Sequence, residues 1–432
     1  MRATRGEDGN FIIALSIELL VLIMFAGLTV NAGMAYITKA RLSKAVDAAC
    51  LTGMKALPQG QAVATQLATH IFNANYGPNA PAPTITFPTD SYGDQQVSVS
   101  GSLQVPTIFA PYMFSSWQVS DTAVSTRGKL VMALILDRSG SMQSDGGATA
   151  LKSAVPAFVN QFNNTLDEVA MISFASNSSV NFAINTNFQT PITNAVKSLN
   201  FNGATFGTGG TFVSTIGPPL TLADNEIGSV AIQPGQNVTR VAVYFTDGKM
   251  NTIQDTLNCS NSPPGHTLYN FGGYDSGSTF DFFNPTTGNN LSSSYGCGGH
   301  GLTCSGFPPY SSGTDCHGIT TFYSQSTSTQ VAFSRTAITA DAQFRALQTA
   351  NAMRAETPGT YVYVIGLGGS VDATTQAFLR QLANDPASTS YNPNLPEGLF
   401  LYVPDCPSTT CTAELQTAFQ TIASKILLRL TQ

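Results

Sequence analysis

One aspartate and two serines stand close together in the segment DRSGSM (137–142), directly after the apolar run LVMALIL (130–136). Such a run is typical of a central strand in a parallel sheet, and open α/β sheets bind ligands beyond the carboxyl ends of their strands. Asp137 stands at that end, and Ser139 and Ser141 follow at alternate positions, so all three side chains can face one point. The alternative is that the two serines only cap the following helix.

Two further strand-end segments offer oxygen ligands for the same edge. GTGGTF (207–212) places Thr211 just before a predicted helix, and TDG (246–248) places Asp247 at the end of another buried strand. Helix capping by the two serines explains neither residue. The five side chains give two carboxylates and three hydroxyls, and this set of hard oxygen donors suits Mg²⁺, with Mn²⁺ and Ca²⁺ as alternatives, but is poor for zinc or copper.

The elements that must position these residues alternate from Lys129 onward, which is typical of a parallel sheet covered on both faces. Predicted strands are 130–136, 169–176, 179–184, 241–248, 361–368 and 399–403, and predicted helices are 149–162 and 412–430. The second and third strands can pair as a hairpin and add an antiparallel edge. The predicted fold class is therefore α/β, a doubly wound and mostly parallel sheet.

The three motifs also carry a family resemblance. DRSGSM at 137–142, GGT at 209–211 and TDG at 246–248, in this order, resemble the von Willebrand factor A (VWA) domain, a Rossmann-like fold, over about 129–432. The resemblance implies a metal-ion-dependent adhesion site whose ligands correspond to Asp137, Ser139, Ser141, Thr211 and Asp247. In such a site the acidic side chain of a protein partner replaces a water on the cation, most simply Mg²⁺.

An apolar segment near the N-terminus, residues 10–38, contains Glu18 as its only charge. About 20 apolar residues suffice to cross a bilayer as a helix, and the segment exceeds the roughly 7–15 apolar residues of a signal peptide. We therefore predict an uncleaved single-pass anchor, with a cleaved signal peptide as the alternative. For Glu18, a position near the membrane surface is the simpler interpretation and a role in subunit assembly the other.

The N-terminal 50 residues carry a second resemblance. A Gly-Asn entry at 9–10, the apolar span and the segment RLSKAVDAAC (41–50) resemble the TadE/TadG-like anchor of tight-adherence (Flp-type) pilus assembly proteins. Glu18 is not five residues after Gly9, so the sequence departs from the pattern that pilin-type processing needs. The resemblance implies the bacterial inner membrane, with pilus or envelope proteins as partners.

The predicted organisation has four parts. They are a cytoplasmic tail (1–9), the anchor (10–38), a small α+β stem (39–127) and the VWA domain (128–432). The stem combines predicted helices at 39–57 and 61–75 with predicted strands at 96–103 and 117–126. The bulk of the chain is then periplasmic or extracellular.

A long segment within the VWA domain, about 251–334, breaks the alternating pattern. It contains no Lys or Arg and four of the seven cysteines, so we predict a disulfide-held surface insertion without regular order. Proximity suggests the pairs Cys297–Cys304 and Cys406–Cys411, which leaves Cys259–Cys316. A zinc cluster formed with His300 and His317 is the alternative for the insertion, and Cys50 is either a buried free thiol or an interchain link.

Composition narrows the functional classes. Charged residues make up 10% of the 432 residues and the net charge is −6, which excludes the basic stripe that nucleic-acid binding needs. No general base accompanies the five candidate ligands, so we expect no enzyme. Two hypotheses remain: a metal-dependent adhesion protein, or a structural envelope subunit whose anchor drives assembly, with a homo-oligomer open in either case.

Overall fold

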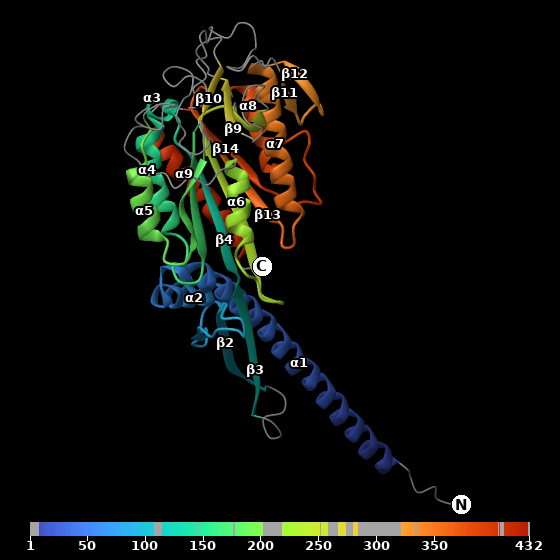
Figure 1. Ribbon diagram of the computed structural model, residues 1–432. Coiled ribbons are helices and arrows are strands. Elements are labelled where there is room, and N and C mark those ends of the chain that lie inside the picture. Colours follow the sequence, from blue (N-terminus) through green and yellow to red (C-terminus); the bar gives the residue numbers. More distant parts are fainter. Residues whose placement is uncertain are drawn as a thin grey trace, which may run out of the picture. The chain divides into compact units, whose positions relative to one another are not determined.

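The chain forms two compact units in the computed structural model (Figure 1), residues 1–127 with 431–432 and residues 128–430. The structure describes residues 8–107, 115–144, 146–175, 178–201, 218–250, 252–257, 267–273, 280–283, 321–332, 335–404, 406 and 410–430.

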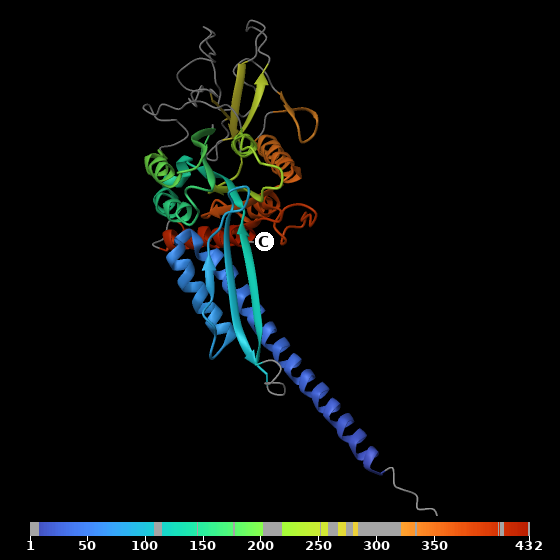
Figure 2. The same ribbon diagram turned by 90° about the horizontal axis from the view of Figure 1, so that it is seen from below.

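The first unit is built on a single long helix, α1 (Asp8–Ala56). Among the described residues, it is the one helix long and apolar enough to cross a membrane, and its most apolar window is only 6% buried. Packing within the unit therefore does not account for this apolar surface, although a signal sequence passes the same test. Figure 2 shows α1 running on as one helix past the elements that pack on its second half.

The second half of α1 forms a small core with the rest of this unit. As predicted, α1 ends just before Pro58, and a helix and a sheet follow. They are the 3₁₀ helix η1 (Leu57–Gln59), helix α2 (Gln61–Tyr76) and the antiparallel strands β1 (Thr84–Thr86), β2 (Gln95–Pro106) and β3 (Ser116–Arg127). Leu42 of α1 and Phe72 of α2 are fully buried there. A Cβ at Gly101 of β2 would lie 2.8 Å from the Leu42 side chain, so glycine permits this close approach of helix and sheet.

Six strands form the central sheet of the second unit, in the order β14-β13-β7-β4-β5-β6. Their bounds are β4 (Lys129–Asp137), β5 (Glu168–Phe174), β6 (Ser178–Asn185), β7 (Val238–Thr246), β13 (Thr360–Leu367) and β14 (Leu399–Val403). All neighbouring pairs are parallel except β5 with β6, which form the predicted antiparallel hairpin. The doubly wound, mostly parallel sheet is confirmed.

Helices cover both faces of this sheet because the strands are apolar on both sides. Leu130, Met132 and Leu134 of β4 join one core cluster, and the residues between them join the other. The first face carries α4 (Gly147–Val159), α5 (Gln189–Ser198) and α9 (Cys411–Arg429), and the second carries α6 (Pro219–Gly228), α7 (Arg335–Ala355) and α8 (Ala373–Ala383). The predicted helices 149–162 and 412–430 correspond to α4 and α9.

The segment between β7 and α7 contains regular structure where none is expected. It includes a three-stranded antiparallel sheet, β10-β9-β8, and the hairpin β11–β12. The bounds are β8 (Thr252–Leu257), β9 (Thr267–Gly273), β10 (Phe280–Phe283), β11 (Thr321–Ser324) and β12 (Thr329–Ala332). The expectation that order lapses over 251–334 is therefore wrong for the described residues. These short strands pair with each other rather than with the main sheet, so the alternating pattern gave no sign of them.

The hairpin β11–β12 is fastened to α7 by one aspartate. Asp341 is fully buried, and its Oδ1 accepts hydrogen bonds from Ser324 Oγ (3.0 Å) and Ser326 N (2.9 Å). Its Oδ2 accepts from Arg345 Nε at 2.7 Å. These three donors come from the hairpin and from α7 itself, so the contact holds the hairpin on the helix.

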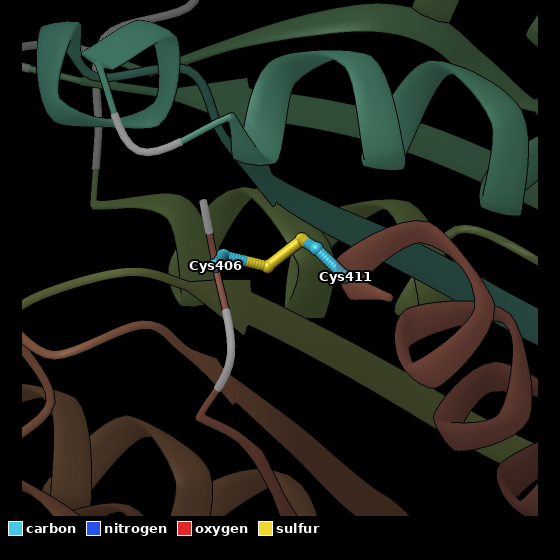
Figure 3. Close-up of a disulfide and its surroundings, with 2 residues drawn as sticks. All are labelled: Cys406 and Cys411. Carbon is cyan, nitrogen blue, oxygen red and sulfur yellow. A yellow bond between two sulfur atoms is a disulfide. The ribbon is translucent and has the colours of Figure 1, made fainter. Parts of the chain in front are cut away.

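The predicted disulfide between Cys406 and Cys411 is present (Figure 3), with the two Cα atoms 5.0 Å apart. It joins the loop after β14 to the first residue of α9. Cys50 is a buried free thiol whose Sγ donates to Val97 O at 3.0 Å, and burial raises the pKa of this thiol. The remaining cysteines, and with them the zinc alternative, lie outside the described residues: Cys259, Cys297, Cys304 and Cys316.

Candidate metal centre

Strand β4 delivers Asp137 to the carboxyl edge of the sheet. The strand is buried from Leu130 to Asp137, and the backbone N–H of Arg138 donates to Phe174 O of β5 at 2.8 Å. The chain then turns, and Ser139 N donates to Asp137 Oδ1 at 2.8 Å. The aspartate thus ends the strand and fixes the start of the turn that carries the serines.

Strand β7 places a second polar group beside Asp137. β4 and β7 are parallel neighbours with Leu136 opposite Phe245, so their last residues lie side by side. Thr246 Oγ1 donates to Asp137 Oδ2 at 2.7 Å, and it accepts from Gly248 N at 3.2 Å. Thr246 therefore holds both the first carboxylate and the turn that carries Asp247.

The two serines and the second aspartate meet in the same place. Ser139 Oγ lies 3.0 Å from Ser141 Oγ and 3.3 Å from Asp247 Oδ1. Ser141 belongs to the short helix α3 (Gly140–Ser144). Helix capping does not explain a contact between Ser139 and Asp247, which follows another strand. The structure thus brings together four of the five predicted residues, and Thr211 lies outside the described residues.

Both carboxylates are withdrawn from solvent, with Asp137 4% and Asp247 1% exposed. Burial raises the pKa of Asp137, and hydrogen bonds from Ser139 and Thr246 oppose that rise. Arg138, the next residue, is also buried, and burial lowers the pKa of its guanidinium to about 10 against the effect of the Asp137 charge. Two buried acids in one place are costly to ionise unless a cation accompanies them.

The donor set fits a hard divalent cation. It consists of two carboxylates and two hydroxyls, all oxygen, and such groups bind Mg²⁺, Mn²⁺ or Ca²⁺. No group of three or more His, Cys, Asp or Glu side chains suited to a metal occurs within the described part of the chain. A centre here therefore relies on hydroxyls in addition to its two acids.

Thr246 is the residue that the sequence analysis missed. It stands directly before Asp247 at the end of a predicted strand, which was the only signal available. Its contact with Asp137 depends on β7 lying next to β4, and strand order cannot be derived from the apolar pattern of either strand.

A mostly parallel sheet between two helix layers, with an Asp-x-Ser-x-Ser turn at its carboxyl edge, defines the class of the second unit. A family model for the von Willebrand factor type A domain matches residues 132–249. A second model, Flp pilus-assembly TadE/G-like, matches residues 9–56. The chain therefore carries a VWA domain and an N-terminal TadE/G-like segment, as the two resemblances predict.

Solved structures similar to the chain include the pilus adhesin SpaC from Lactobacillus rhamnosus GG, with 15% identity, 81% of this chain and 35% of that chain covered, and a TM-score of 0.39. The vWF domain of the type V pili tip protein Mfa5 from Porphyromonas gingivalis has 14% identity, 71% and 97% coverage, and a TM-score of 0.39. A mussel byssus protein, PTMP1 with a zinc-occupied MIDAS motif, has 13% identity, 70% and 46% coverage, and a TM-score of 0.33. Likenesses this distant carry no argument about function, and no curated protein matches the chain.

Proposed function

We propose that the protein is a membrane-anchored, metal-dependent binding protein of the bacterial envelope that acts in Flp/Tad-type pilus assembly or surface adhesion. One observation carries the proposal: Ser139 lies within hydrogen-bond distance of two aspartates from the ends of neighbouring strands. Its backbone N–H donates to Asp137, and its hydroxyl donates to Asp247. A scaffold domain needs no such convergence of buried acids and hydroxyls. The VWA and TadE/G-like family matches support the same class of protein.

The chemistry of the site is recognition rather than catalysis. A bound Mg²⁺, or Mn²⁺ or Ca²⁺ in its place, would offer a coordination position to an oxygen of the partner. Asp137, Asp247, Ser139 and Ser141 would hold the cation, and Thr211 is the fifth proposed ligand. Because serine and threonine add no charge, the site retains its attraction for a partner's Asp or Glu carboxylate. The role is therefore non-enzymatic binding of an acidic side chain.

The anchor sets the location. The TadE/G-like match covers the helix that is long and apolar enough to cross a membrane, which supports a single-pass protein of the inner membrane. The Cys406–Cys411 disulfide suits an oxidising compartment, so the VWA domain would lie on the periplasmic or extracellular side. Pilus or envelope proteins are then the proposed partners, and self-association through the anchor would give a homo-oligomer.

Calorimetric titration of Mg²⁺, Mn²⁺ and Ca²⁺ into the full-length protein in detergent micelles tests the proposal. We expect binding to the wild type and its loss in Asp137→Asn, which keeps the shape of the side chain but removes its charge. Ser198→Ala is the control, because Ser198 Oγ donates to Ala195 O within its own helix, at the end of α5. Binding in the control with none in Asp137→Asn supports the metal centre.

A different result would favour the second hypothesis. If neither wild type nor variant binds a divalent cation while both remain folded, the VWA domain acts as a scaffold and the anchor drives assembly. If Asp137→Asn binds as tightly as wild type, the ions occupy another place and the proposed ligands are wrong.

A further inference from the structure

An exposed cation stands beside the candidate metal centre. Lys249 follows Asp247 by two residues, and its Nζ lies 3.0 Å from Asp372 Oδ2. The two side chains are 41% and 49% exposed, so this ion pair faces solvent. In the sequence, Lys249 is the one lysine or arginine between Arg240 and Arg335. A single positive charge therefore marks the start of the insertion, next to the site.

The turn after β7 keeps Lys249 close to the ligand set. Two residues span at most about 7 Å, so the Cα atom of Lys249 lies within that distance of the Cα atom of Asp247. The hydrogen bond from Gly248 N to Thr246 Oγ1 (3.2 Å) fixes the turn that carries both residues. Asp372 lies in the connection from β13 to α8, and β13 is the neighbour of β7 on the side away from β4. The pair therefore borders the centre at the same edge of the sheet.

Asp372 has a structural role that does not depend on its contact with Lys249. It is the N-cap of α8, and its Oδ1 accepts from Thr375 N (2.7 Å) and from Thr375 Oγ1 (2.8 Å). The other oxygen, Oδ2, contacts Lys249. Exposed ion pairs contribute little to stability. Lys249 can therefore exchange Asp372 for another carboxylate without disturbing the helix.

We propose that Lys249 is a specificity-determining residue, which leaves Asp372 and pairs with the acidic group of the partner that docks at the metal centre. This inference rests on the proposed function and adds a second contact to it. A partner carboxylate that gives one oxygen to the cation has another to accept from an ammonium group. Asp372 competes with the partner for Lys249, so removing the lysine and removing the aspartate have opposite effects on binding.

Surface plasmon resonance of the full-length protein on a carboxylate-terminated monolayer tests this, with a carboxamide-terminated monolayer as the neutral surface. The signal of interest is the part that requires Mg²⁺ and disappears with EDTA. We expect Lys249→Gln to weaken this binding roughly tenfold, since it removes a charge contact with the carboxylate. Asp372→Asn strengthens it roughly threefold, because asparagine preserves the N-cap and frees the lysine.

Two control variants make the same changes in net charge elsewhere. Lys197→Gln alters an exposed lysine of α5, and Asp47→Asn alters an exposed aspartate of α1. The inference requires each test variant to differ from its control. It is overturned if Lys249→Gln and Asp372→Asn both weaken binding, as a purely structural ion pair would, or if each merely matches its control.

Calorimetric titration of Mg²⁺ into the same variants separates this inference from the proposed function. Intact Mg²⁺ binding, with no difference between test and control variants on the carboxylate surface, overturns the role of Lys249 alone. If the wild type binds Mg²⁺ but does not bind the carboxylate surface, both the role of Lys249 and the recognition of an acidic partner are overturned. A wild type that binds no Mg²⁺ overturns the metal centre itself and the inference that depends on it.

Discussion

Two clusters in the second unit, residues 128–430, combine a buried aspartate with two serines spaced two residues apart. They are the Asp137 cluster (Asp137, Ser139 and Ser141) and the Asp341 cluster (Asp341, Ser324 and Ser326). The serine hydroxyl oxygens lie 3.0 Å apart in the first and 2.8 Å apart in the second. The aspartates are 4% and 0% exposed. By residue type and burial, the two are nearly alike.

The groups that complete each cluster differ in charge. In the Asp341 cluster, Arg345 Nε donates to the carboxylate at 2.7 Å, so the chain itself provides the neutralising cation. In the Asp137 cluster, the serine hydroxyl contacts a second carboxylate, Asp247, at 3.3 Å, and the buried cation Arg138 interacts with Asp137. The charge of the Asp341 cluster is thus balanced within the chain, and the cluster is structural. The Asp137 cluster has more negative charge, which an external cation can neutralise. Composition alone would not separate them.

Exchanging each aspartate for asparagine gives the largest expected contrast. Asp341→Asn breaks a buried ion pair and should destabilise the domain by about 2 kcal/mol, less than a fully buried pair because Arg345 keeps some exposure. Asp137→Asn, without a metal present, should cost no more than about 1 kcal/mol, since asparagine retains an acceptor for Ser139 N and a polar contact with Thr246. Scanning calorimetry in EDTA measures both.

Mg²⁺ provides the complementary half of this experiment. At a concentration of 100 times its dissociation constant, a ligand that binds only the folded state adds about 2.7 kcal/mol of stability. We expect this gain in wild type and in Asp341→Asn, but not in Asp137→Asn. The comparison between clusters fails if Mg²⁺ stabilises Asp137→Asn as much as wild type, or if Asp341→Asn leaves the unfolding temperature unchanged.

Substitutions of the serines should show the same contrast between the two clusters, with smaller effects. Ser139→Ala removes a proposed ligand that also contacts Asp247, so Mg²⁺ affinity should fall by roughly 30-fold with little change in stability. Ser324→Ala removes a hydrogen bond to Asp341 and should cost about 1 kcal/mol of stability while Mg²⁺ affinity stays the same. Titration calorimetry and thermal unfolding of both variants distinguish the two roles. Equal losses of affinity would mean that Ser324 communicates with the metal centre.

The sequence was sufficient to predict the sheet and the convergence of four polar side chains because each depends on a local pattern. The apolar run before Asp137 and the alternation of strands with helices identify the doubly wound fold. Asp137 ends one such strand and Asp247 directly follows another, and parallel strands bring their carboxyl ends to one edge. The order of the three motifs along the chain is a second, independent reason to expect these residues at one edge of the sheet.

What could not be predicted depends on contacts between segments distant in the sequence. The bond of Thr246 to Asp137 follows from β7 lying beside β4, and nothing in either strand specifies that order. The Asp341 cluster joins a hairpin and a helix whose hydrophobic pattern gave no sign of each other. The strands of the insertion were missed for the same reason, since they pair only among themselves.

The smallest predicted effect concerns Thr246, which donates to Asp137 as Arg345 donates to Asp341. Thr246 Oγ1 donates to Asp137 Oδ2 at 2.7 Å, so a neutral hydroxyl stands where the Asp341 cluster has a guanidinium. Thr246→Val removes this donor with little change in volume, and Mg²⁺ affinity should fall by up to about tenfold because the carboxylate loses its orientation.

Thr246→Ser is the matched variant, because it retains the hydroxyl and loses only a methyl group. Titration calorimetry should find near wild-type Mg²⁺ affinity in the serine variant and reduced affinity in the valine variant. Equal weakening in both would show that the packing of the methyl group, rather than the hydrogen bond, orients Asp137. In that case a neutral donor would not be what distinguishes the Asp137 cluster, and its second carboxylate alone would account for the difference.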